Sequence, residues 1–63
     1  GMRSNIDIAV MIGQGVPPSF RKRGLRVCWV VLINGEPRGT AFESRAEAEE
    51  CRSAWMRQLT MAA

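Results

Sequence analysis

Residues 27–59 read VCWVVLINGEPRGTAFESRAEAEECRSAWMRQL, and this stretch decides most of the fold. An apolar run ends at Asn34-Gly35, a second short run ends at Phe42, and an amphipathic segment follows. Asn and Gly tolerate the positive φ angles of a tight hairpin turn, so Asn34-Gly35 predicts two antiparallel strands, 26–33 and 37–42. The segment that follows them predicts a helix over 44–59.

The start of this helix is marked by Ser44 and Glu47, which have the spacing of a capping box. Acidic residues gather at this end and Arg57 lies near the other end, an order that suits the helix dipole. An apolar stripe follows helical spacing along one face: Ala48, Cys51, Trp55 and Leu59. The stripe predicts that the helix packs on the sheet.

A further strand precedes the hairpin. Residues 6–12 alternate, with four β-branched side chains on one side: Ile6, Ile8, Val10 and Ile12. Val16-Pro17-Pro18 cannot continue a sheet, so residues 13–25 are predicted to be a long loop. Pro37 cannot donate to another strand, which makes the third strand an edge and leaves the first strand to pair with the second. The sequence therefore predicts an α+β fold: a three-stranded antiparallel meander, order 1-2-3, with one C-terminal helix on one face.

The hairpin turn also predicts a register and a choice of faces. The expected pairs are Ile33–Glu36, Leu32–Pro37, Val31–Arg38, Val30–Gly39, Trp29–Thr40, Cys28–Ala41 and Val27–Phe42. The helix can cover the face of Val27, Trp29, Val31 and Phe42, or the opposite face, where Gly39 and Ala41 would let it come close. We expect the first face, with Trp29, Phe42 and Trp55 at the centre of the core.

The chain has 63 residues, which allows one domain, 2–63, with Gly1 interpreted as the remnant of an expression tag. A domain of this size buries only about 60% of the surface that its unfolded chain exposes. Such domains usually gain stability from a disulfide, a metal or a partner subunit. Two cysteines without any histidine are a poor zinc set, so we expect no metal and no cofactor, and a partner chain becomes the leading candidate.

The sequence carries no export signal, and the apolar run 6–12 is too short to span a bilayer. We therefore expect a cytoplasmic protein without membrane contact, in which Cys28 and Cys51 are reduced, small core residues. A disulfide between strand and helix is the alternative. Catalysis is not expected, because the chain has no histidine and neither thiol has a neighbour that would activate it.

The face away from the helix is predicted to be apolar, with a self-association strip of Cys28, Val30, Leu32, Gly39 and Ala41. Monomers seldom expose an apolar patch of a few hundred Å². We expect a homodimer, formed when two such faces stack or when the first strands pair across a two-fold axis. The predicted function is a small non-enzymatic interaction module without a small-molecule ligand.

The charge distribution gives an alternative function. Net charge is +3, with +4 in residues 1–26 and −1 in residues 27–63. Cations beside an exposed aromatic ring would hold phosphates and stack on a base, which makes nucleic acid the alternative partner. The candidate contacts are Phe20, Arg21, Lys22, Arg23, Arg26 and Arg38. In the other interpretation Phe20 tucks under the sheet edge and the cations keep the loop soluble.

A family resemblance points the same way. The pattern Trp29-Val30-Val31, a Gly-containing turn, Arg38, Thr40, Phe42, Ser44 and Ala46-Glu47-Ala48 resembles the arm-type DNA-binding domains of tyrosine recombinases. It is also similar to small uncharacterised bacterial β-β-α domains, and it covers about residues 26–56. The resemblance implies that the sheet face away from the helix enters the DNA major groove, with Arg26, Cys28, Val30, Leu32, Gly39 and Ala41 on that face. These residues are mostly apolar, whereas base readout uses Arg, Lys, Asn or Gln.

Overall fold

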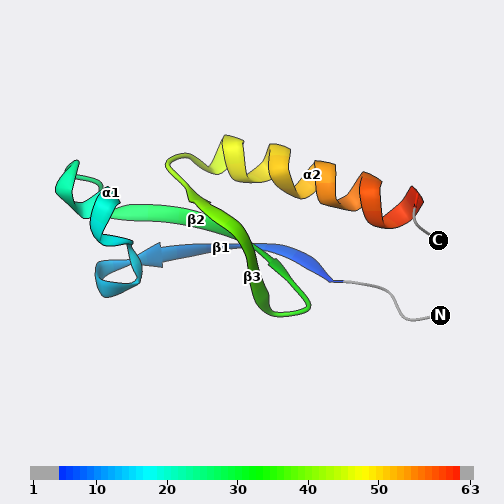
Figure 1. The fold of residues 1–63 in the computed structure, drawn as a ribbon, viewed down its shortest axis with the longest axis horizontal. Coiled ribbons are helices and arrows are strands. Elements are labelled where there is room, and N and C mark those ends of the chain that lie inside the picture. Colours follow the sequence, from blue (N-terminus) through cyan, green and yellow to red (C-terminus); the bar gives the residue numbers. More distant parts are fainter. Residues whose placement is uncertain (1–4, 62–63) are drawn as a thin grey trace.

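The computed structural model describes residues 5–61 and contains a three-stranded antiparallel sheet of order β1-β2-β3 (Figure 1). In chain order the elements are β1 (Ile6–Ile12), the 3-10 turn η1 (Gly13–Gly15), α1 (Pro18–Lys22), β2 (Val27–Ile33), β3 (Glu36–Phe42) and α2 (Arg45–Met61). The three strands and the C-terminal helix confirm the predicted α+β fold class. Pro37 lies in β3, which is an edge strand as predicted.

The prediction that residues 13–25 form a loop is wrong in one respect, because this segment contains η1 and the short helix α1. The proline pair that cannot continue a strand instead starts a helix. Pro17 is the N-cap of α1 and Pro18 is its first residue, where a missing N–H has no intrahelical partner to lose. From the sequence, the two prolines indicate only that a strand cannot continue through residues 17 and 18.

The hairpin has the predicted register next to its turn, where Ile33 pairs with Glu36 and Val31 with Arg38. Beyond Val31 the prediction is wrong, because a β-bulge shifts the pairing so that Trp29 lies opposite Phe42. Gly39 lies in the bulged segment with a φ of 77°, a conformation that only glycine adopts without strain. The shift is even in residue number, so Phe42 stays on the same face as Trp29.

The hydrophobic core lies between α2 and the face of the sheet that we predicted. Its buried centre is Ile6, Val31 and Ile33, against which Phe42, Cys51, Trp55 and Leu59 pack. Trp29 is only half-buried and is not part of this cluster, so its predicted place at the centre of the core is wrong. The reason is that α2 begins just after Phe42 and covers the half of the sheet nearer Ile6.

The other face of the sheet is covered at the opposite end by the segment after β1. Val16 is 1% exposed and Cys28 is fully buried. Cys28 pairs with Met11, and a Cβ added to Gly15 would lie 3.1 Å from the Met11 Cε atom. The chain after β1 therefore folds back onto the Met11 side of the sheet. The η1–α1 segment thus lies on the Met11 side of the sheet and α2 on the other side. Figure 1 shows the two helices toward different ends of the sheet.

The capping box at the start of α2 gives a first prediction. The Ser44 hydroxyl accepts a hydrogen bond from the Glu47 N–H at 3.2 Å and donates one to Glu47 Oε1 at 3.0 Å. We expect Ser44→Ala to lower the free energy of unfolding by about 1 kcal/mol in urea titration, because an amide at the helix start loses its partner. Ser53→Ala, an exposed position of the same helix, is the matched control and should leave stability nearly unchanged. Equal effects of the two substitutions would contradict the capping role.

Candidate self-association edge

The outer edge of β1 is the first feature of interest, since within residues 5–61 this strand pairs only with β2. The Asn34 N–H donates to the Asn5 carbonyl at 2.8 Å, so Asn5 directs its backbone groups toward β2. In an antiparallel ladder, alternate residues of a strand point their N–H and C=O groups to the same side. The groups that face away from β2 therefore belong to the alternating apolar row: Ile6, Ile8, Val10 and Ile12.

One end of this edge is closed by the protein's own helix. The Nε atom of Arg52 in α2 donates to the outward carbonyl of Ile6 at 2.8 Å, and this hydrogen bond is partly buried. A polar hollow between β1 and α2 continues this region, lined by Asp7, Ile8, Arg45, Glu49, Arg52 and Ser53. Pairing of a further strand with β1 is thus obstructed at Ile6, whereas the edge from Ile8 to Ile12 remains accessible to such a strand.

The open part of the edge carries the most exposed large apolar side chains. Val10 is 56% exposed and Ile12 is 71% exposed, whereas Ile6 at the closed end is 9% exposed. All three lie on the face covered by α2, because they pair with Trp29, Val27 and Ile33 of β2. The helix covers only the Ile6 end of this face. We call Ile8, Val10 and Ile12 the open edge.

The exposed apolar side chains lie on the open edge, whereas the sequence predicts them on the opposite face. The position of the helix cap is the signal that could indicate the open edge. A helix that is capped by Ser44 shortly after β3 runs over one half of the sheet, and within the described residues the other half of the same face stays uncovered.

The predicted self-association strip is partly covered by the chain itself. Cys28 is fully buried within the chain, so it cannot contact a partner. Val30, Leu32 and Ala41 are half-buried, and Gly39 is exposed in the bulge. The η1–α1 segment, which the sequence predicts to be a loop, explains why Cys28 is covered without a partner.

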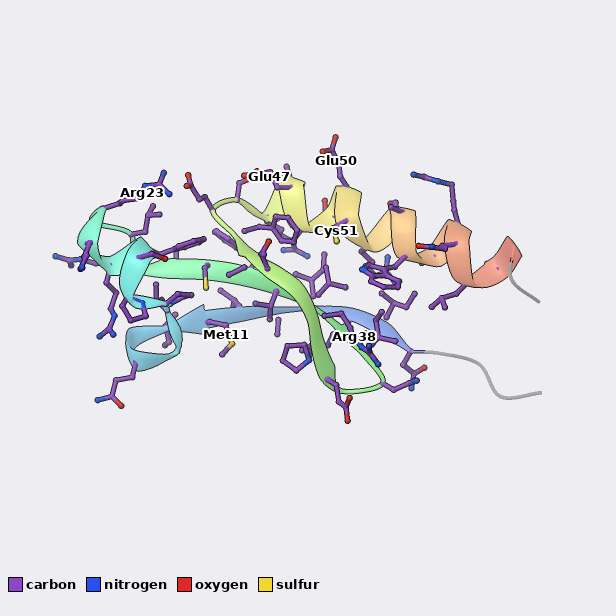
Figure 2. The ribbon with its side chains drawn as sticks, in the orientation of Figure 1. Met11, Arg23, Arg38, Glu47, Glu50 and Cys51 are labelled. Carbon is purple, nitrogen blue, oxygen red and sulfur yellow. The ribbon has the colours of Figure 1, made fainter. Side chains whose placement is uncertain are left out.

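The candidate nucleic-acid contacts do not form one cluster. Phe20 is half-buried in α1, while Arg21, Lys22 and Arg26 are exposed near it. Arg23 forms an ion pair with Glu43, which removes it from the free cations. Arg38 lies on β3, paired with Val31, and Figure 2 shows it well away from Arg23 and α1. Three of the candidate cations, Arg21, Lys22 and Arg26, are therefore exposed near the α1 end of the sheet.

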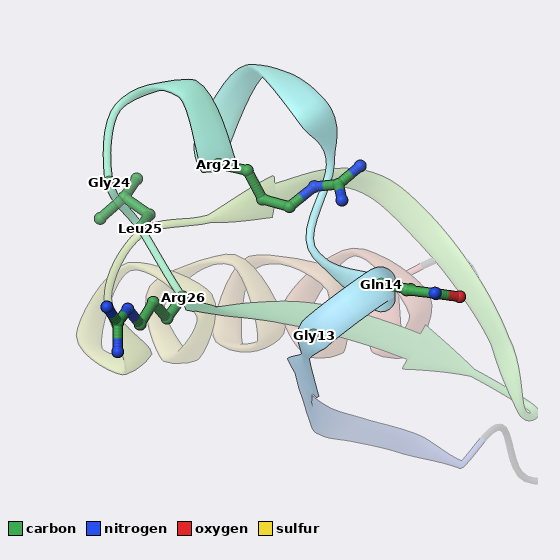
Figure 3. Close-up of a pocket in the computed structure, with 6 residues that line it drawn as sticks. All are labelled: Gly13, Gln14, Arg21, Gly24, Leu25 and Arg26. Atoms are coloured by element: carbon green, nitrogen blue, oxygen red, sulfur yellow. The ribbon is translucent and has the colours of Figure 1, made fainter.

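A shallow pocket of about 690 Å³ lies at this end, lined by Gly13, Gln14, Arg21, Gly24, Leu25 and Arg26. Figure 3 shows the side chains of Arg21 and Gln14 extending to the same side of the pocket, whereas Arg26 extends away from them. Gly13 and Gly24 have positive φ angles, which allow the chain to turn here without a Cβ. The arrangement offers hydrogen-bond donors to an anion, but it holds no nucleophile or base.

The two cysteines are free and lie on opposite sides of the sheet. Cys28 pairs with Met11, on the side of the sheet where Gly15 lies, whereas Cys51 packs against the core beneath α2 (Figure 2). The alternative of a disulfide between strand and helix is therefore wrong, because the sheet separates the two thiols. Among the described residues, no group of three or more Cys, Asp or Glu side chains is arranged to bind a metal. No helix in residues 5–61 has the length and apolar character needed to cross a membrane.

Comparisons with known proteins give no match: no protein-family model fits the chain, and neither a curated protein nor a solved structure is significantly similar to it. The resemblance to the arm-type DNA-binding domains of tyrosine recombinases stays a prediction.

Proposed function

We propose that the protein is a non-enzymatic interaction module that forms a homodimer by pairing of the β1 edges. The observation that carries this proposal is made within residues 5–61: from Ile8 to Ile12 the outward backbone groups of β1 meet no other strand, and Val10 and Ile12 of the same strand are exposed. An exposed, flat, apolar edge strand is a template for another strand, and soluble proteins usually blunt or cover such edges. In β1 the single charged residue is Asp7, and no charge lies from Ile8 to Ile12.

The size of the core supports a partner. Within the described residues the buried hydrophobic residues are Ile6, Val16, Cys28, Val31, Ile33 and Ala48, and every aromatic side chain is only half-buried. Full burial of one Val or Ile side chain stabilises by roughly 1.5–3 kcal/mol. A second copy would cover Val10 and Ile12 on both chains. Because of the two-fold symmetry, the free energy gained by burying these side chains is obtained once from each chain.

A second copy is favoured over another strand donor because β1 is self-complementary. The residues of β1 whose N–H and C=O groups face away from β2 are all β-branched and apolar. An antiparallel second copy therefore places the same residues opposite them, in reverse order. Two such sheets would join into one six-stranded sheet with both α2 helices on the same face.

The oligomeric mass tests the proposal. Sedimentation equilibrium of the full chain from 5 to 500 µM should give twice the 7.0 kDa protomer mass at the upper end. The apolar contact should hold or tighten as salt is raised. A protomer mass at every concentration would reject the proposal.

Nucleic-acid binding is the second candidate function, favoured by the exposed Arg21 and Arg26, which line the shallow pocket, and by the exposed Lys22 next to Arg21. If it occurs, the affinity for duplex DNA should fall by about 0.9 log unit per log unit of salt for each phosphate neutralised. Arg21→Gln with Arg26→Gln should then reduce that slope by roughly 2, measured by fluorescence anisotropy. Arg57→Gln, an exposed arginine of α2, is the control. An unchanged slope in the double variant would contradict a role for this end of the sheet.

A further inference from the structure

We propose that Arg52 sets the register of the dimer, so that the two-fold axis passes through Val10. The inference rests on the proposed homodimer and specifies its geometry. In this register Val10 lies opposite Val10 of the second copy, and Ile8 lies opposite Ile12 of the second copy. The whole open edge is then paired with the second copy, and the residues of β1 before Ile8 remain outside the paired segment.

The backbone pattern limits the choice of register. Only Ile6, Ile8, Val10 and Ile12 point their N–H and C=O groups outward, so hydrogen-bonded pairs must join members of this row. Four two-fold registers that pair Val10 satisfy this condition. An axis at Met11 joins only Val10 to Ile12 and leaves Ile8 unpaired. An axis at Val10 pairs the whole open edge. An axis at Ala9 joins Ile8 to Val10 and Ile6 to Ile12, and an axis at Ile8 joins Ile6 to Val10.

Arg52 separates the axis at Val10 from the axes at Ala9 and Ile8. Both of these require the carbonyl of Ile6, which already accepts the Arg52 Nε–H at 2.8 Å. The guanidinium group also occupies the space beside Ile6 that a second strand would enter. The axis at Val10 leaves this hydrogen bond intact, because Ile6 then lies outside the paired segment.

Exposure agrees with the axis at Val10. This register covers Val10 and Ile12, which are 56% and 71% exposed, and does not use Ile6, which is already 9% exposed. Asp7 also falls outside the paired segment, so no carboxylate is brought against an apolar strand. Arg52 thus acts as a positioning residue that closes one end of the edge.

Single-cysteine cross-linking tests the register in the full chain, with Cys51→Ser as background and Cys28 left in place because it is fully buried. Facing residues of a hydrogen-bonded pair have Cα atoms about 5.5 Å apart, within the range of a disulfide. Val10→Cys should therefore form a covalent dimer under mild oxidation. Ile12→Cys should not, because its two copies would lie about 13 Å apart along the strands.

The other registers that use Ile6 give a different result. Cross-linking through Ala9→Cys or Ile8→Cys but not Val10→Cys, in a protein that is a dimer by mass, would overturn the register and leave the homodimer intact. A monomeric mass would overturn both proposals. In the Arg52→Ala background, Ala9→Cys should begin to cross-link, because the Ile6 carbonyl is released. No cross-linking of Ala9→Cys in that background, with circular dichroism of the folded protein unchanged, would remove the role given to Arg52.

Discussion

Val10→Lys is expected to convert the dimer into a monomer, with the dissociation constant raised by roughly 100-fold or more, about 2.7 kcal/mol. The substitution removes an apolar contact and brings two ammonium groups together at the two-fold axis. Like charges directly opposite on neighbouring strands are destabilising, and a lysine on an edge strand is a common protection against pairing. Sedimentation velocity across a concentration series measures the change.

The protomer itself should tolerate this substitution, because Val10 is 56% exposed. Met56→Lys is the matched control, since Met56 is another large apolar residue, 43% exposed, that lies on α2 and outside the paired segment 8–12. Val10→Glu alone should also be monomeric, and a mixture of the Lys and Glu variants should associate again. If Val10→Lys and Met56→Lys weaken the dimer equally, the contact does not lie at the β1 edge.

Val31→Ala is expected to have the largest effect on stability, lowering the free energy of unfolding by about 2 kcal/mol. Val31 is fully buried at the centre of the core, where β1 and β3 flank it and α2 covers it. A domain of this size has an overall stability of roughly 3–9 kcal/mol, so the loss would be a large fraction of the total. Urea denaturation followed by tryptophan fluorescence measures it.

Val10→Ala is the control for this measurement, and it should be made in the monomeric concentration range. It removes the same two methyl groups from the same face of the sheet, but from an exposed site. Its effect on unfolding should be within about 0.5 kcal/mol. Equal losses for the two substitutions would mean that the core does not lie where α2 meets the sheet.

Much of the fold could be predicted because its signals are local. Asn34 has a positive φ of 54° and Gly35 one of 84°, which is the turn chemistry that the dipeptide predicts. The Glu47 N–H donates to the Ser44 hydroxyl, as the capping box predicts, whereas the Glu47 carboxylate accepts a hydrogen bond from that hydroxyl rather than from the Ser44 N–H. The choice of the helix-covered face was also correct, because Phe42 and the cap fix the side to which the chain turns.

The remainder depends on contacts between distant residues. The bulge at Gly39 could not be located from the alternation pattern, since a glycine in a strand is compatible with several distortions. The fold-back of residues 13–23 covers Cys28, which the sequence alone indicated only as an apolar side chain. The hydrogen bond from Arg52 to Ile6 joins residues far apart in the chain, so no local pattern could indicate that this end of the edge is closed.

Amide hydrogen exchange at residues 8–12, measured in dilute and in concentrated protein, tests the central claim most directly. The N–H groups of Ala9 and Met11 face β2 and should be protected at both concentrations, which makes them internal controls. The N–H groups of Ile8, Val10 and Ile12 face outward, and we predict that they exchange freely when dilute and become protected when concentrated. Free exchange of these three amides in concentrated protein, with Ala9 and Met11 still protected, would contradict a second strand at the β1 edge.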